Sequence, residues 1–363
     1  VELRREVAAC FPEAEHPYDA LLTGYEAGAT TAGVRATFAR LAEGLVPLVE
    51  AIAERPEPPA LPGPFAEEAQ RALGREIALA MGYEDSAWRM DDSVHPFSMT
   101  ISRRDVRVTS RWSTEDFSGL FATMHEVGHG LYEAGVDPAL ERTTLGEGTS
   151  MGIHESQSRL WENQVGRSLP FWRHWYPRAQ ELFSGALRGL EVEDFHRAIN
   201  VVRPSLIRVD ADEATYSLHV ILRFELEVAL IEGTLAVADV PAAWNERMRE
   251  LLGVEVPDDA HGCLQDVHWS YGEFGYFPTY ALGNIVSGQL WEAARSDLPD
   301  LDDRLAAGDC AALLAWLREH VHRFGRRLDP ADIVREATGG PLDPDPQLRY
   351  LREKYGALYG LDG

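Results

Sequence analysis

The sequence contains few cysteines, no long apolar run and few basic residues relative to acidic ones. Three cysteines are scattered among 363 residues, too few for a disulfide framework or a thiolate metal site. Any metal ion must therefore bind nitrogen and oxygen ligands. No apolar stretch is long enough to cross a bilayer, and the N-terminal residues lack the apolar core of a signal peptide. We therefore expect a cytoplasmic protein that does not bind membranes.

The shortage of basic residues also limits the classes of partner. The chain has 59 acidic residues and 34 lysines and arginines, which gives a formal net charge of −25 at pH 7. Such a charge repels the phosphate backbone of nucleic acids, so we do not expect nucleic acid as a partner. An anionic group on a substrate must be met by local arginines.

Most of the chain is predicted to be helical. Apolar residues recur at spacings of three and four in 30–54, 64–82 and 212–233, and 339–360 reads as a loop followed by a short helix. The segment 97–112 alternates apolar and polar residues around a central turn, which predicts a β-hairpin. The expected fold is mainly α with a small sheet. We expect one domain over 1–363, because the proline-rich connector 55–64 reads as a surface loop.

The stretch "HEVGH" (125–129) is the strongest chemical signal. We expect a helix capped by Ser113 or Thr114 and stopped by Gly135. On this helix His125 and His129 lie one turn apart on one face, where both imidazoles reach one ion.

Neighbouring residues complete the pattern of a metal-activated water site. Glu126 lies alongside the two histidines. Gly128 and Gly130 weaken a helix, so we expect another segment to approach closely there.

A catalytic zinc site needs a third protein ligand and one open position. The segment "GEGTSMGIHESQSRLWENQVG" (146–166) starts with turn residues and continues as a helix, far enough along the chain to return antiparallel. Glu155 is the preferred third ligand. His154, which points about 100° away on the helix, and Glu162, two turns along, are alternatives that the sequence leaves open.

Six motifs occur together in one order. They are "HPF" (95–97), "DVRVT" (105–109), "HEVGH" (125–129), "HESQ" (154–157), "IRVDAD" (207–212) and "GCLQDVHW" (262–269). This set resembles the carboxypeptidase Taq family of zinc metallocarboxypeptidases. The resemblance implies an elongated helical body with a deep central groove and a small sheet at its edge, similar to the neurolysin-like zinc peptidases, or gluzincins.

The resemblance also implies roles for individual residues. His125, His129 and Glu155 would bind one Zn²⁺ per chain, and Glu126 would act as general base; cobalt or manganese also suits this ligand set. The remaining expectations concern the substrate. Arg208, in preference to Arg107, would bind its carboxylate, and His95 would either position the substrate or cap the hairpin. His268 and a tyrosine, Tyr276 in preference to Tyr280, would stabilise the oxyanion. We expect Asp266 to orient a histidine rather than bind metal.

The expected substrates are peptides with a free C-terminal carboxylate. An endo-acting zinc oligopeptidase of the same fold is the alternative, since it shares the two-histidine motif. The family resemblance also implies a homodimer. Because family members are usually longer, we expect this chain to lack the N-terminal helical segment that covers the groove.

Overall fold

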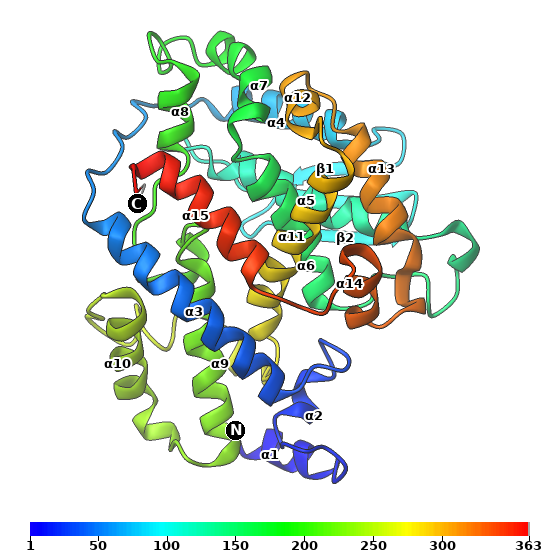
Figure 1. Ribbon diagram of the computed structural model, residues 1–363, viewed down its shortest axis with the longest axis vertical. Coiled ribbons are helices and arrows are strands. Elements are labelled where there is room, and N and C mark those ends of the chain that lie inside the picture. The colour runs from blue at the N-terminus through cyan, green and yellow to red at the C-terminus, as the bar shows by residue number, and fades with distance from the viewer. Residues whose placement is uncertain (362–363) are drawn as a thin grey trace.

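The computed structural model describes residues 1–361 and is mainly helical, as predicted (Figure 1). In the first half of the described chain the helices are α1 (Glu2–Ala9), α2 (Asp19–Leu22), α3 (Thr31–Ala53), α4 (Glu67–Met81), α5 (Ser118–Gly135), α6 (Met151–Arg159) and α7 (Leu169–Leu182). In the second half they are α8 (Val192–Ala198), α9 (Tyr216–Glu232), α10 (Val240–Leu252), α11 (Pro278–Asp297), α12 (Leu301–Ala306), α13 (Ala311–His320), α14 (Pro330–Thr338) and α15 (Asp345–Tyr359).

The long helices predicted from apolar spacing are confirmed, with ends set by local caps. The Thr30 side chain accepts a hydrogen bond from the Gly33 amide and begins α3. The helix predicted over 212–233 begins four residues later, because the Asp212 carboxylate accepts hydrogen bonds from the Ala214 and Thr215 amides and holds a turn.

The sheet contains the predicted hairpin and one further strand. Strands β2 (Ser98–Ser102) and β3 (Asp105–Ser110) pair antiparallel, which confirms the hairpin. Strand β1 (Trp88–Asp92) pairs parallel with β3 and gives the order β1-β3-β2. We did not predict β1: it is short, it ends in two aspartates, which are disfavoured in strands, and its partner lies beyond another strand.

Helix α5 begins later than predicted. We expected a cap at Ser113 or Thr114, but the first helical residue is Ser118 and no side chain caps it. Instead, Ser113 Oγ accepts from the Glu115 amide and Asp116 Oδ1 accepts from the Ser118 amide. These short polar side chains stabilise a turn in place of the helix, so the prediction was wrong by about one turn.

The other end of α5 also differs from the prediction. Gly135 does not stop the helix in a left-handed conformation; it is the last helical residue, and Val136 follows as the cap. A Cβ at Gly135 would lie 2.4 Å from Nδ1 of His322, a fully buried ring. The glycine therefore permits a close helix-to-ring approach rather than a turn.

Two clusters of buried apolar side chains form the core. One surrounds the sheet with α4, α5, α7 and α13, and the other joins α3, α9 and α10. Figure 1 shows α4, α7 and α13 in the upper part of the view and α3, α9 and α10 at the lower left, with α15 crossing between them. Partly buried Leu342 and Tyr350 pack against both clusters. The single domain stays a prediction, and of the described helices none has the length and apolarity needed to cross a bilayer.

Candidate metal centre

The centre forms where α5 packs directly against α6. A Cβ at Gly128 would lie 2.8 Å from the Ser158 Cα and 2.9 Å from the Gln157 carbonyl oxygen, so only glycine permits this approach. At Gly130 a Cβ would lie 2.6 Å from the Trp88 ring. The close contacts expected at both glycines are therefore confirmed: Gly128 lets α6 approach α5, and Gly130 lets the sheet approach it.

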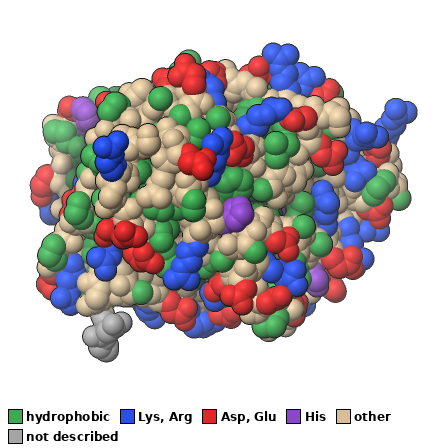
Figure 2. All heavy atoms as spheres, turned by 90° about the horizontal axis from the view of Figure 1, so that it is seen from above, with side chains coloured by type: hydrophobic (Ala, Val, Ile, Leu, Met, Phe, Trp, Pro, Cys, Tyr) green, Lys and Arg blue, Asp and Glu red, His purple; other side chains and the backbone are tan. Residues whose placement is uncertain are grey.

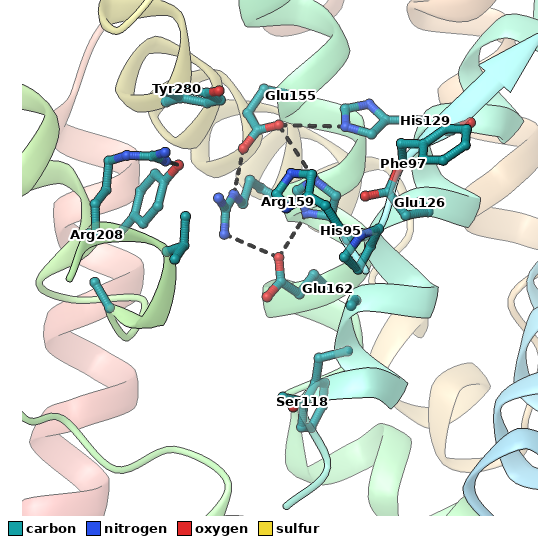
Figure 3. Close-up of a pocket in the computed structure, with 18 of the residues that line it drawn as sticks. His95, Phe97, Ser118, Glu126, His129, Glu155, Arg159, Glu162, Arg208 and Tyr280 are labelled. Atoms are coloured by element: carbon teal, nitrogen blue, oxygen red, sulfur yellow. Dashed lines mark hydrogen bonds and ion pairs between the residues drawn. The ribbon is translucent and has the colours of Figure 1, made fainter. Parts of the chain in front are cut away.

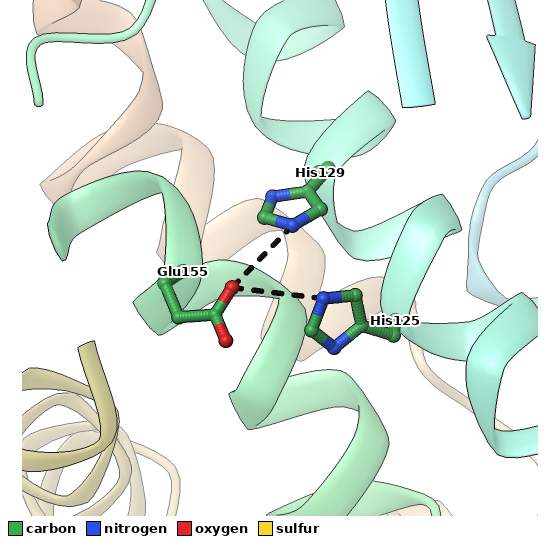
Figure 4. A group of neighbouring side chains, drawn as sticks. All are labelled: His125, His129 and Glu155. Atoms are coloured by element: carbon green, nitrogen blue, oxygen red, sulfur yellow. Dashed lines mark ion pairs between the residues drawn. The ribbon is translucent and has the colours of Figure 1, made fainter. Parts of the chain in front are cut away.

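The three predicted metal ligands converge at this contact (Figure 4). Glu155 Oε2 lies 3.6 Å from Nε2 of His125 and 3.6 Å from Nε2 of His129. One ligand atom from each residue lies within 4.8 Å of the others. Zinc bonds of about 2.0 to 2.2 Å in a tetrahedron place ligand atoms about 3.3 Å apart. The donor set and its spacing therefore fit a small divalent cation.

Other side chains hold two of these ligands (Figure 3). Glu162 Oε2 lies 2.9 Å from His125 Nδ1, on the ring edge away from Glu155. Arg159 Nε donates to Glu155 Oε1 at 2.7 Å, and its Nη1 donates to Glu162 Oε2 at 3.2 Å. Because Arg159 binds Oε1, only Oε2 of Glu155 is directed at the histidine pair.

The two alternative ligands lie behind the centre. His154 Nδ1 is 2.7 Å from His129 Nδ1, and Glu162 contacts His125 through the same ring position. Both therefore contact the nitrogen that does not face Glu155. Glu162 belongs to a π-helical turn, Leu160–Val165, that continues α6; such turns occur often at functional sites.

Glu126 lies beside the centre and is only 7% exposed. Burial, together with the nearby carboxylates of Glu155 and Glu162, raises the pKa of Glu126 to about 7, although His125 opposes the shift. A carboxyl group with such a pKa is suited to accept and return a proton near neutral pH.

The centre opens into a cavity of about 820 Å³ between the two apolar clusters. It is lined by all four residues of the metal centre and by several of the predicted substrate residues, namely His95, Arg208, Tyr276 and Tyr280. Figure 3 shows Arg208 and Tyr280 on one side of Glu155 and His95 with Phe97 on the other. The metal ligands therefore lie between Arg208 with Tyr280 on one side of the cavity and the segment that leads into β2 on the other.

Arg208 is held by a buried ionic network. Its Nε and Nη2 donate to Asp266 Oδ1 at 3.1 and 2.8 Å, and its Nη1 donates to the Tyr216 hydroxyl at 2.8 Å. Asp266 also binds Arg223. Burial alone would raise the pKa of Asp266, but Arg223 and Arg208 overcome this effect and lower it to about 2. We expected Asp266 to orient a histidine, yet its main contacts are these two arginines, and His268 Nδ1 is 3.8 Å away.

His268 is not among the residues that line the cavity. Its Nε2 lies 3.1 Å from the Tyr280 hydroxyl, so it contacts the cavity wall from behind. Burial and the positive charge of Arg208 lower the pKa of His268 to about 4, so the ring is neutral near pH 7. The tyrosines also resist ionisation: burial raises the pKa of Tyr276 to about 12, and burial with the neighbouring Tyr276 raises that of Tyr280 further.

Arg107 lies away from the metal centre. It forms an ion pair with Asp105 on β3 and does not line the cavity, whereas Arg208 does. Within residues 1–361, the structure therefore brings only one of the two predicted carboxylate-binding arginines to the metal centre.

This arrangement matches a known family over nearly the whole chain. The family model for the carboxypeptidase Taq (M32) metallopeptidases matches residues 1–355. The chain belongs to this family. It is 46% identical to thermostable carboxypeptidase 1 of Thermus thermophilus, over 94% of this chain and 68% of that protein. It is 42% identical to carboxypeptidase 1 of Bacillus subtilis, over 99% of this chain and 72% of that protein.

Solved structures of M32 carboxypeptidases share the fold. The enzyme of Deinococcus radiodurans R1 superposes with a TM-score of 0.97 at 44% identity, over 99% of this chain and 73% of that one. The carboxypeptidase of Pyrococcus furiosus gives 0.94 at 37% identity, over 98% and 72%. The chain is therefore a metallocarboxypeptidase, a peptide hydrolase whose family implies a divalent metal. The closer likeness to neurolysin stays a prediction.

Several residues of the M32 site were not predicted. Arg159 follows Glu155 by four residues, and this helical spacing of opposite charges was a usable signal. The contact of Tyr216 with Arg208 carries no such signal, because the two residues meet only through the fold. The same holds for Arg167, whose guanidinium lies 4.0 Å from the centroid of the Phe121 ring in the cavity wall.

Proposed function

We propose that this M32 enzyme binds one zinc ion through His125, His129 and Glu155 and removes single residues from the C-termini of peptides. The observation that carries the proposal is the convergence of these three ligands beside a buried glutamate in one cavity. Two nitrogens and one carboxylate oxygen leave a coordination position open, which is typical of catalytic rather than structural zinc. Cobalt and manganese remain alternatives for the same ligands.

Glu126 would serve as general base and then as general acid. Bound zinc would supply Lewis-acid polarisation of the peptide carbonyl and lower the pKa of a water molecule. The Glu126 carboxylate would take a proton from the attacking water and deliver it to the nitrogen of the leaving amino acid. Its burial in the cavity wall beside the three ligands supports both roles.

Arg208 would bind the C-terminal carboxylate of the peptide. Three of the five N–H groups of its guanidinium are used by Asp266 and Tyr216, and each Nη retains one hydrogen. Two such donors suit a bidentate contact with a carboxylate. Since Asp266 and Tyr216 hold the guanidinium, little side-chain entropy would be lost when the peptide binds.

The tyrosines would stabilise the oxyanion. Tyr276 and Tyr280 both line the cavity and keep their hydroxyl protons at neutral pH, which a hydrogen-bond donor requires. His268 would act indirectly, by holding the Tyr280 hydroxyl. His95, exposed on the hairpin side of the cavity, would contact the substrate on the other side of the metal. Arg107 has no proposed part in substrate binding.

A pair of acyl dipeptides tests the function. We expect the zinc-loaded enzyme to release the last residue from the peptide with a free carboxylate and to leave the matching C-terminal amide uncut. Equal hydrolysis of both would instead favour an endo-acting oligopeptidase.

Glu126→Gln should keep wild-type zinc content and lose activity by at least about 100-fold, because general acid–base catalysis contributes about that much.

The quaternary structure is a separate proposal. The resemblance to the family implies a homodimer, and light scattering on the purified enzyme would measure the mass directly. A monomer at micromolar concentration would contradict that part without affecting the proposed chemistry.

A further inference from the structure

The two histidines of the metal centre are held in different ways. Nδ1 of His125 contacts a carboxylate directly, because Glu162 Oε2 lies 2.9 Å away. Nδ1 of His129 contacts a second imidazole, His154, at 2.7 Å. The carboxylate on this side lies beyond the His154 ring, whose Nε2 is 2.8 Å from Glu133 Oε1. His129 is thus linked to Glu133 through an interposed histidine.

Binding of a metal by Nε2 of His129 would fix the directions of these hydrogen bonds. A histidine that binds a metal through Nε2 carries its proton on Nδ1. Nδ1 of His129 must then donate, so Nδ1 of His154 must accept and carry no proton. The neutral His154 ring therefore holds its proton on Nε2, where Glu133 accepts it. One tautomer of His154 satisfies both contacts, and the other satisfies neither.

The surroundings hold this chain of residues in place. The Gly148 amide donates to the same Glu133 oxygen at 3.0 Å. A Cβ at Gly148 would lie 2.9 Å from His154 Cδ2 and 3.0 Å from Glu133 Oε1, so the loop closes tightly over both side chains. The Tyr132 ring packs edge-on against His154, with centroids 5.1 Å apart. Packing and hydrogen bonding thus act on the same ring.

We propose that His154 is a positioning residue for the metal centre: Glu133 selects its tautomer, and His154 in turn sets the orientation and proton position of His129. The inference rests on the proposed metal-binding function. His154 also lines a second cavity of about 670 Å³ next to the main one, and its side chain is 23% exposed. Because solvent competes for an imidazole nitrogen, the Glu133 contact is needed to keep His154 in the accepting form.

Two substitutions at one position separate this role from simple packing. His154→Leu fills the space but offers no acceptor to His129. His154→Gln offers both an acceptor and a donor through one amide group. Loss of such an orienting partner typically weakens metal binding by about 10- to 100-fold. We expect that loss in His154→Leu and recovery to within about threefold of wild type in His154→Gln, measured as the zinc dissociation constant by competition with a chelator.

A matched control and a double substitution complete the series. His261→Leu removes another histidine that contacts a carboxylate, Asp258, on the exposed surface, and should leave zinc affinity unchanged. Glu133→Leu should weaken zinc binding, and the Glu133→Leu/His154→Leu double variant should bind zinc no more weakly than His154→Leu alone, because one chain of contacts is lost once.

The wild-type protein gives a test that does not depend on folding of the variants. Long-range ¹H–¹⁵N correlation spectra of the zinc-loaded enzyme should show His154 protonated on Nε2 and His129 on Nδ1. Protonation of His154 on Nδ1, unchanged zinc affinity in His154→Leu, or equal losses in the Leu and Gln variants would each overturn the inference. If the wild-type protein bound no zinc at all, the proposed function itself would fail, which is a distinct outcome.

Discussion

Arg208 illustrates how a charged side chain can be buried and still remain available to a ligand. Burial opposes its charge, but Tyr216 and Asp266 overcome that effect and raise its pKa, so the guanidinium stays protonated. Asp266 is shared with Arg223, which leaves the two arginines and one carboxylate with a net positive charge. An incoming peptide carboxylate would neutralise it. This local charge is needed because the molecule as a whole carries −25.

The role of Arg208 predicts a selective kinetic defect. Arg208→Ala should lower kcat/KM for free-carboxylate peptides by about 10- to 100-fold, since a hydrogen bond to a charged group contributes about 1.5 to 3 kcal/mol. The loss should appear mainly in KM. Arg107→Ala is the matched control, because Arg107 is paired with Asp105 outside the cavity. Wild-type KM in Arg208→Ala, or an equal defect in Arg107→Ala, would contradict the assignment.

How far single site residues can be predicted depends on whether their partners are local. His125, Glu126 and His129 follow from helical spacing, and the need for a third ligand led to the segment 146–166, in which Glu155 was preferred. The order of motifs led to Arg208 as the preferred arginine but kept Arg107 as a second candidate, since a sequence does not reveal that Asp105 already pairs with it. Likewise, His154 and Glu162 remained alternative ligands until the direction of each side chain was known.

Helices and strands, like the site residues, were predictable where the interactions that form them are local in the sequence. The long helices and the hairpin were predictable because their apolar periodicity is contained within each segment. Strand β1 was missed because its pairing with β3 is parallel and requires a distant partner. The start of α5 was placed too early because Ser113 and Asp116 cap a turn, an outcome that depends on a competition between two local structures.

Because α5 packs closely on α6, a glycine-to-alanine substitution in α5 should lower the stability of the protein, whereas the same substitution in α15 should raise it. Gly128→Ala should destabilise the protein by about 1 to 3 kcal/mol, because the new Cβ overlaps the backbone of α6. Gly356→Ala in α15 meets no atom within 4 Å and should stabilise by up to about 1 kcal/mol through helix propensity. Thermal unfolding of both variants measures the difference. Equal shifts in Tm would contradict the packing argument.

The whole molecule combines a strongly acidic composition with many local ion pairs. Figure 2 shows acidic and basic side chains interspersed over the face that it presents. Such exposed pairs contribute little to stability individually. Buried carboxylates have a larger effect on how the stability of the protein depends on pH. Glu26 is one of these: it accepts hydrogen bonds from Ser150 Oγ and the Gly152 amide at the N-terminus of α6.

Glu26 predicts a loss of stability as pH rises. Burial raises its pKa from 4.5 to about 7, although its hydrogen bonds oppose the shift. The folded state therefore holds this proton more tightly than the unfolded state, and the resulting stability is lost as pH rises from about 4.5 through 7. Relative to Glu26→Gln, the wild type should lose about 2 to 3 kcal/mol of unfolding free energy between pH 5 and pH 8. Chemical denaturation at both values checks this, and a pH-independent difference would disprove it.

The central claim is that one divalent cation binds where α5 meets α6. The most direct measurement is anomalous diffraction at the zinc absorption edge from crystals of the zinc-loaded enzyme. We predict one strong peak per chain, within bonding distance of Nε2 of His125, Nε2 of His129 and Oε2 of Glu155. A peak elsewhere in the chain, or no peak at these three side chains after zinc loading, would contradict the account.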